Sequence, residues 1–317
     1  MDFKFALDEK NKRILPSFLR MTNETDKEFF PQEKKRRFGA LIPECIVMFI
    51  INAFTIFAFA RKHHLRKRTT YLIINLTVAD LLVGVVMGSL ETRLYFDKIE
   101  PGCCFSWRKF VILTFSSIFP LASQGNLSLI SLERLHATLY PFKHCLIEKW
   151  VYFKIIIGSW LMALLLSSGL SFLHLCVPEA VPYALASHCF VTLLILTISY
   201  AIINYSMKSN PLPYHSGSVV SDRKLSVTLF IVTVVSVLTI LPAAIWNSII
   251  PVVRGQLSHG TEIRIRLTVI VLYLANSIVN PVIYAIRMQE FREAVKQLTC
   301  KRAHEPPSVQ PIELHAM

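Results

Sequence analysis

The chain has 317 residues, of which 53% are hydrophobic and 17% charged, and its formal net charge is +13. This composition excludes an ordinary soluble domain and puts a membrane protein first. A positive net charge can indicate a nucleic-acid partner, but the basic residues here stand in short clusters between long apolar runs, where lipid headgroups are the nearer partner. We therefore expect membrane lipid, and no nucleic acid, among the partners.

Seven apolar runs follow one another, each long enough for a helix to cross about 30 Å of hydrocarbon. They cover roughly residues 39–60, 70–92, 108–133, 150–176, 187–207, 225–251 and 266–287. Continuous runs of this length fit helices rather than barrel strands, because a helix satisfies its own backbone polar groups. The sequence predicts an all-α, seven-transmembrane helix bundle.

The N-terminal segment before the first run is rich in charges and holds no apolar core, so we expect no cleaved signal peptide. Asn23 begins an Asn-Glu-Thr sequon, which predicts glycosylation if this segment lies outside the cell. Lys/Arg residues in the loops are nearly balanced between the two sides, so the charge rule leaves the orientation open.

Asp80 lies midway along the second run. A charged side chain at mid-bilayer costs at least about 2.5 to 3.5 kcal/mol on insertion scales, so such a residue usually serves function. The alternative is that Asp80 only hydrogen-bonds neighbouring helices and holds them together.

One face of the third run is polar. Helical periodicity puts Ser116, Ser123 and Arg134 on that face, and Glu133 precedes the arginine. This arrangement predicts an acid–base pair at one membrane surface. The alternative is a basic anchor that reaches the lipid headgroups.

The seventh run carries Asn276 and Asn280 one turn apart on one face, followed by Pro281 inside the helix. A proline there frees a backbone carbonyl and weakens the helix locally. We predict a bendable point beside two amides.

Together these residues resemble the rhodopsin-like (class A) G-protein-coupled receptors, over about residues 39–300. The likeness is carried by Asn52, Leu76-Thr-Val-Ala-Asp80, Glu133-Arg134-Leu135, Pro141, Trp160, Pro242, Asn280-Pro-Val-Ile-Tyr284 and Phe291-Arg292. Several motifs in order at matching depths hardly arise by chance. The resemblance implies a multi-pass plasma-membrane protein with an extracellular tail (1–38), a receptor domain (39–287), a short amphipathic surface helix (288–300) and a cytoplasmic tail (301–317).

The resemblance also implies roles for individual residues. Asn52, Asp80, Ser123, Asn276 and Asn280 match the family's sodium pocket and switch core, and carboxylate, hydroxyl and amide oxygens suit a hard cation. Glu133, Arg134, Pro141, Asp222, Tyr200 and Tyr284 match the latch that couples to a heterotrimeric G protein, with Pro242 and Pro281 as hinges. A sodium ion is the only metal implied, and no cofactor is expected.

The sequence departs from the family at several positions. Thr239-Ile-Leu-Pro242 lacks the tryptophan of the sixth span, so an atypical or ligandless receptor stays possible. Lys109 stands where the third span's outer cysteine is usual; Cys103 or Cys104 could instead pair with Cys176 or Cys189. Cys300 is a candidate for palmitoylation.

The ligand is not identified by the sequence, but two classes are excluded. Ser116 stands where receptors for amines carry an aspartate, and Leu274 where opsins carry the retinal lysine, so neither an amine bound through that aspartate nor retinal is expected. The residues predicted to line a pocket are Glu91, Ser116, Ser117, Pro120, Trp246, Asn247 and Tyr273, each of which equally fits helix packing.

Two other functions would also place polar residues inside a membrane bundle. A transporter or ion-conducting protein would use Asp80 and the facing amides, but the sequence shows no internal repeat of the kind that such folds usually have. An intramembrane enzyme would need a constellation such as His-x-x-x-His or Gly-x-Ser-x-Gly, and neither occurs, so no enzyme is expected.

Overall fold

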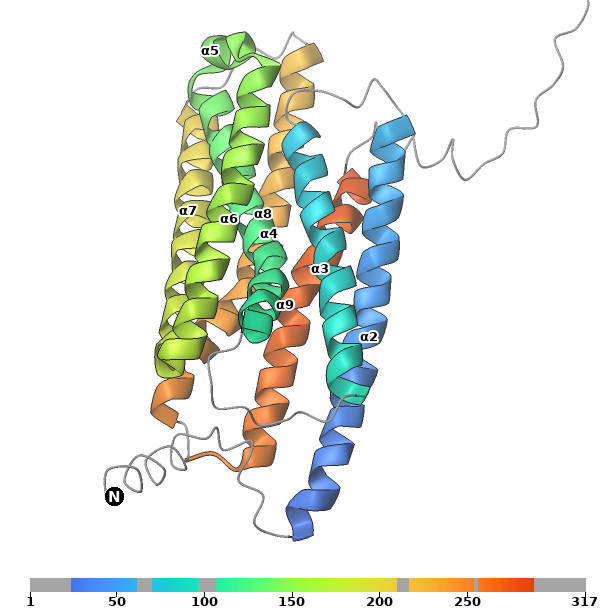
Figure 1. Ribbon diagram of the computed structural model, residues 1–317. Helices are drawn as coiled ribbons and strands as arrows, with labels where there is room; N and C mark the ends of the chain where they lie inside the picture. Colours follow the sequence, from blue (N-terminus) through green and yellow to red (C-terminus); the bar gives the residue numbers. More distant parts are fainter. Residues whose placement is uncertain (1–23, 62–69, 97–106, 210–216, 254–255, 288–317) are drawn as a thin grey trace, which may run out of the picture.

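The computed structural model describes residues 24–61, 70–96, 107–209, 217–253 and 256–287 (Figure 1). Its long helices are α2 (Glu24–Arg61), α3 (Thr70–Phe96), α4 (Trp107–Leu139), α6 (Lys149–Cys176), α7 (Val181–Ser209), α8 (Gly217–Val253) and α9 (His259–Arg287). A short helix, α5 (Pro141–Leu146), and a 3-10 turn, η3 (Pro178–Ala180), lie between them. These residues contain no strand, and seven helices are long and apolar enough to cross a membrane. The all-α seven-helix prediction is confirmed, while the predicted surface helix over 288–300 lies outside the described residues.

The long helices stand side by side and alternate in direction, with α4 nearest the middle (Figure 1). α2 packs against α3 and α9, α3 against α4, and α7 against α8, which in turn packs against α9. α4 contacts α3, α6, α7 and α8, so a residue on α4 can meet partners from most of the bundle. We call the end of the bundle that carries α5, together with Arg61 and Leu139, the α5 end.

Several helices extend beyond the apolar runs. α2 begins at Glu24, well before residue 39, and α9 begins at His259 rather than near 266. An apolar run marks the thickness of the hydrocarbon, whereas a helix continues into water wherever its backbone and charged side chains are satisfied. In the first turns of α2, for example, Arg36 donates to Glu33 at 2.8 Å, one turn apart.

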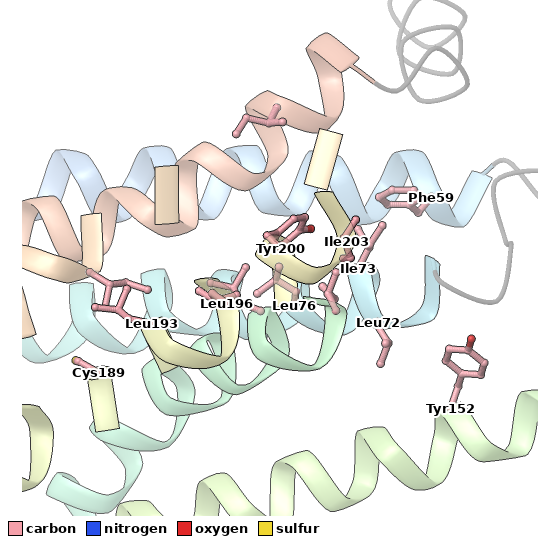
Figure 2. Packing of buried hydrophobic residues seen from close by; sticks show 14 of the residues in the cluster. Phe59, Leu72, Ile73, Leu76, Tyr152, Cys189, Leu193, Leu196, Tyr200 and Ile203 are labelled. Carbon is pink, nitrogen blue, oxygen red and sulfur yellow. The ribbon is translucent and has the colours of Figure 1, made fainter. Parts of the chain in front are cut away.

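The interior of the bundle is more polar than its wall. Large apolar side chains such as Ile157, Leu161 and Leu165 point outward from α6, where hydrocarbon would solvate them. An apolar cluster nevertheless fills the inside towards the α5 end, where Leu72 and Leu76 of α3 lie near Leu196 and Tyr200 of α7 (Figure 2). The buried polar side chains of the bundle lie next to this apolar cluster.

Two glycines bring α3 close to α2. A Cβ atom added at Gly84 would lie 3.0 Å from the Cys45 carbonyl oxygen, and one at Gly88 would lie 3.3 Å from the Cys45 Cβ. Small residues at helix crossings permit such close approach in membranes. The contact fixes α2 against α3 and so helps to place Asn52, which lies two turns along α2 from Cys45.

Candidate functional site

The carboxylate of Asp80 is fully buried and accepts hydrogen bonds from two other helices. Ser123 of α4 donates to Oδ1 at 2.5 Å, and Ser277 of α9 donates to the same oxygen at 2.7 Å. Asn280 of α9 donates to Oδ2 at 3.2 Å. A buried carboxylate is tolerated only when hydrogen bonds replace its lost hydration, and here three donors do so. Asp80 therefore joins α3, α4 and α9.

Two further contacts extend this polar network. The Asn52 amide of α2 donates to the Met48 carbonyl at 2.9 Å and to the Ser277 carbonyl at 3.1 Å. Thr239 of α8 donates to the Asn276 side-chain oxygen at 3.3 Å. Asn276 thus contacts α8. The network as a whole ties α2, α3, α4, α8 and α9 together at one depth.

The oxygens near Asp80 fit a small hard cation. The side-chain oxygens of Asn52 and Asn280 are buried and accept no hydrogen bond, and the hydroxyls of Ser123 and Ser277 add two more oxygens next to the carboxylate. Hard cations select such ligands. By contrast, the described residues hold no group of three or more His, Cys, Asp or Glu that could bind a transition metal.

A second polar cluster joins α3, α4 and α6. The Asn75 amide donates to the Asn126 side-chain oxygen at 2.8 Å, and the Trp160 indole donates to the Asn75 oxygen at 2.9 Å. The indole N–H is thereby satisfied inside the bundle, as buried tryptophan requires. Both asparagines are buried.

Arg134 and Glu133 form a buried pair at the α5 end. Arg134 is 5% exposed, and its guanidinium donates to the two Glu133 oxygens at 2.5 and 2.7 Å. Two parallel bonds of this kind are the strongest arrangement of an arginine and a carboxylate. Tyr152 of α6 donates to Glu133 at 3.2 Å, and His144 of α5 lies 3.3 Å from the same oxygen. Glu133 is therefore held from three sides.

The structure describes the side chains of some, but not all, of the other residues of the predicted latch. Tyr200 of α7 is buried, hydrogen-bonds Thr233 of α8 and has its ring tilted against that of Phe230, with 5.7 Å between the ring centroids. Pro141 begins α5 and is exposed. The side chains of Asp222 and Tyr284 lie outside the described residues. Pro242 and Pro281 both lie inside helices, α8 and α9 respectively, as predicted.

Two of the residues predicted to line a ligand pocket lie close to the polar network. Pro120 and Tyr273 border a void of about 10 Å³ that is also lined by Ser123, Gln124 and Asn276. A void of about 10 to 15 Å³ holds one water molecule, so this space suits a single water or ion rather than an organic ligand.

The remaining residues of the predicted pocket are engaged in the helices or between them. Glu91 is buried and accepts from Arg37 of α2 at 2.5 Å. Ser117 shares a hydrogen bond with Ser167 of α6 at 2.8 Å. Ser116 and Asn247 donate to carbonyls of their own helices, and Trp246 is half-buried on α8. Helix packing, the alternative that the sequence left open, accounts for the hydroxyl of Ser117.

The predicted modifications are largely beyond the described residues. Cys103, Cys104, Asn23 and Cys300 all lie outside them. Cys176 and Cys189 are free thiols in the structure, and Cys189 is buried, with the Gln124 amide 4.0 Å from its sulfur. The disulfide, the glycosylation and the palmitoylation all remain predictions.

Three residues of the site were not predicted from the sequence. Ser277 lies one turn before Asn280 on the same helix face, so helical spacing from Asn280 was a usable signal. Tyr152 and His144 carried no such signal, because their contact with Glu133 depends on how α6 and α5 pack against α4.

Comparison with known proteins agrees with this arrangement. Residues 51–284 match the family model described as 7 transmembrane receptor (rhodopsin family). The somatostatin receptor type 5 of Bos taurus is 23% identical over 79% of this chain and 72% of its own length. The neuropeptide FF receptor 2 of Mus musculus is 23% identical over 84% and 75%, and the somatostatin receptor type 1 of Rattus norvegicus is 21% identical over 86% and 73%. Because the family match spans most of the chain, the protein belongs to the rhodopsin family of seven-transmembrane receptors.

Proposed function

We propose that this receptor binds an extracellular peptide and activates a heterotrimeric G protein inside the cell. Family membership supports the coupling. The relatives named above are receptors for somatostatin and neuropeptide FF, which are peptides. Ser116, in place of the aspartate that amine receptors carry, supports a ligand of another class. The N-terminus then lies outside the cell and the α5 end faces the cytosol.

The observation that carries the proposal is the link that α4 makes between two buried charges. Ser123 of α4 binds Asp80 in the middle of the bundle, and Arg134 of the same helix is held by Glu133 at the α5 end. Ser123 and Arg134 are eleven residues, or about 16 Å of helix, apart. A change in the packing around Asp80 can therefore reach Arg134 through one rigid element.

The α5 end also offers a surface for a protein partner. Phe142 and Leu146 lie one turn apart on α5 and are 88% and 81% exposed. Large apolar side chains exposed together on a surface mark an interaction site. They lie next to His144, which touches Glu133, so a bound G protein would be in contact with the element that holds the charged pair.

The mechanism that we propose is a shift between two states. In the resting state Arg134 pairs with Glu133, and Asp222 at the start of α8 supplies a second negative charge. The peptide binds the active state better and shifts the population by its difference in affinity, since no ligand can do more. Helix α8 then moves about the weak point at Pro242 and exposes Arg134 to the G protein.

A sodium ion at Asp80 would stabilise the resting state. Asp80, Ser123, Asn280 and Ser277 would hold it, and its charge would neutralise the carboxylate. The chain itself carries out no catalysis in this proposal. Its family membership also disfavours the transporter reading of Asp80.

Guanine-nucleotide exchange on a panel of G proteins, in cells that express the chain with an N-terminal epitope, tests the proposal. The epitope should be accessible on intact cells, and a peptide fraction should raise exchange on at least one G protein. An epitope that is accessible only after permeabilisation would contradict the orientation. Exchange that no peptide alters, measured for a receptor proven to reach the surface, would contradict the peptide ligand.

A further inference from the structure

His144 of α5 lies against the carboxylate that holds Arg134. Its Nε2 atom is 3.3 Å from Oε1 of Glu133, and the side chains of His144 and Glu133 are 17% and 9% exposed. A ring nitrogen this close to a carboxylate oxygen carries its hydrogen there, because a bare lone pair would be repelled. His144 is therefore a hydrogen-bond donor to Glu133.

The second ring nitrogen of His144 is buried. Nδ1 meets no hydrogen-bond partner among the described residues. The imidazole lies edge-on to the ring of His136 on α4, with 5.7 Å between the ring centroids. Within the described part of the chain, Glu133 is the one carboxylate within ion-pair distance of His144. A change in the charge of the imidazole therefore acts first on Glu133 and on the arginine bound to it.

The other charged and titratable groups near His144 belong to α4, α5 and α6. They are Arg134 and His136 on α4, Lys143 and Cys145 beside His144 on α5, and Glu148, Lys149 and Tyr152 at the start of α6. The Lys143 ammonium lies over the Tyr140 ring, 5.5 Å from its centroid, and Glu148 and Lys149 are exposed. The Tyr152 hydroxyl donates to the same Glu133 oxygen as His144, at 3.2 Å. Arg134 is thus the cation that shares Glu133 with His144.

Arg134 already neutralises Glu133 in this arrangement. The guanidinium donates to both carboxylate oxygens, at 2.5 and 2.7 Å, and Arg134 is 5% exposed. A proton on His144 would add a second positive charge beside a neutral pair that is largely withdrawn from water. It would strengthen the hydrogen bond to Glu133 but repel the guanidinium. These two effects oppose each other as long as Arg134 stays in place.

Activation removes the repulsion. In the function proposed above, on which this inference rests, Arg134 leaves Glu133 when the G protein binds. A buried carboxylate that loses its cation is unfavourable, because its charge is no longer compensated. A protonated His144 can then donate a charge-assisted hydrogen bond to Glu133 with no guanidinium opposing it. The active state therefore binds a proton at His144 more tightly than the resting state does.

We propose that His144 is a positioning residue for the Glu133–Arg134 pair and that its proton makes the receptor respond to cytosolic pH. Histidine changes its charge between about pH 5 and 8, the range in which a cell works. A ligand favours the state that binds it better, and the ligand here is the proton. Acidification of the cytosol therefore raises basal signalling. The rise is about fivefold, the difference between a neutral and a charge-assisted hydrogen bond.

Basal guanine-nucleotide exchange by the purified receptor in lipid nanodiscs, at about pH 6 and about pH 8, tests the proposal. His144→Gln keeps a donor but takes up no proton, and His144→Arg is charged at both pH values. Dividing the wild-type rate by the His144→Gln rate at each pH removes the pH dependence of the G protein itself. This ratio should rise about fivefold on acidification. His144→Arg should show the higher rate at both pH values.

Two other histidines serve as controls. His136→Gln removes the ring next to His144, and His174→Gln removes an exposed histidine at the opposite end of the bundle. Both variants should keep the wild-type response to pH. A response of equal size in His144→Gln, or a basal rate that falls on acidification relative to that variant, would overturn the proposal.

A second measurement does not depend on the G protein. The ring signal of His144, followed by NMR of the histidine-labelled receptor, should titrate at a higher pH in Arg134→Gln than in the wild type, because the variant lacks the opposing guanidinium. An unchanged midpoint would overturn the proposal. A raised midpoint together with wild-type basal exchange in Glu133→Gln would instead contradict the proposed latch and leave the coupling between the proton and Arg134 intact.

Discussion

Ser277 of α9 donates a hydrogen bond to Asp80 of α3 at 2.7 Å, although the two residues are 197 positions apart in the sequence. The same oxygen of Asp80 also accepts from Ser123 of α4 at 2.5 Å. One carboxylate oxygen thus holds three helices at the centre of the bundle. Meanwhile the Ser277 carbonyl accepts from Asn52, so α2 joins the same point through the same serine.

Ser277→Ala should lower the stability of the receptor. It removes one hydrogen bond to a buried charged group, and such a loss costs about 1.5 to 3 kcal/mol. Thermal unfolding of the purified receptor in detergent measures the effect. Ser168→Ala is the control, because the Ser168 hydroxyl bonds only carbonyls of its own helix and is exposed; its effect should stay within about 0.5 kcal/mol. Equal effects of the two variants would show that the Ser277 contact does not hold the helices together.

Asp80→Asn should abolish any stabilisation by sodium. The amide keeps the size of the carboxylate but removes the charge that attracts the ion, while the Asn280 oxygen, now without a partner, can accept from the new amide. Thermal unfolding is compared in sodium chloride and in choline chloride at equal ionic strength. The wild type should unfold at a higher temperature in sodium, and the variant at the same temperature in both. A sodium effect that survives the substitution would place the ion elsewhere.

Gly84→Ala should weaken the contact between α2 and α3. The added Cβ would lie 3.0 Å from the backbone oxygen of Cys45, which cannot move without its helix. Overpacking of this kind costs about 1 to 3 kcal/mol. Gly158→Ala is the control, since nothing lies within 4 Å of a Cβ at that position and alanine favours the helix. The surface expression and the temperature of thermal unfolding should fall for Gly84→Ala and not for Gly158→Ala.

The sequence predicted the switch core through resemblance and missed its detailed connections. Asp80, Ser123 and Asn280 do meet, but the fourth residue at Asp80 is Ser277, while Asn276 bonds Thr239. Neighbouring residues on a helix point about 100° apart, so a modest rotation of α9 decides which one faces Asp80. That rotation depends on packing against α2 and α8, and no local pattern in the sequence specifies it.

The fold was easier to predict than the ends of its elements. Long apolar runs specify the number and type of the spanning helices, because lipid allows few alternatives. The short helix α5 was not expected, since six residues give no periodicity to recognise. Its contribution to the site, the contact of His144 with Glu133, was therefore missed as well.

Tyr152→Phe should raise ligand-independent signalling modestly. The phenol donates to Glu133 at 3.2 Å and so helps to fix the carboxylate that binds Arg134. Loss of a bond of this length should favour the active state by about 1 kcal/mol or less. Basal guanine-nucleotide exchange at equal surface expression measures it. Tyr205→Phe is the control, because Tyr205 is exposed on α7; a rise of equal size in both variants would assign no role to the Tyr152 hydroxyl.

We propose that the negative charges around Arg134 hold the receptor in its resting state. Basal guanine-nucleotide exchange by Glu133→Gln and by Asp222→Asn, at surface expression matched to the wild type, tests it most directly. Each variant should raise exchange several-fold: Glu133→Gln weakens the pair that Glu133 forms with the guanidinium of Arg134, and Asp222→Asn removes the second negative charge that we propose for the resting state. Glu148→Gln, an exposed carboxylate near α5, should leave exchange unchanged. Basal exchange that stays at the wild-type level in both variants would contradict the account.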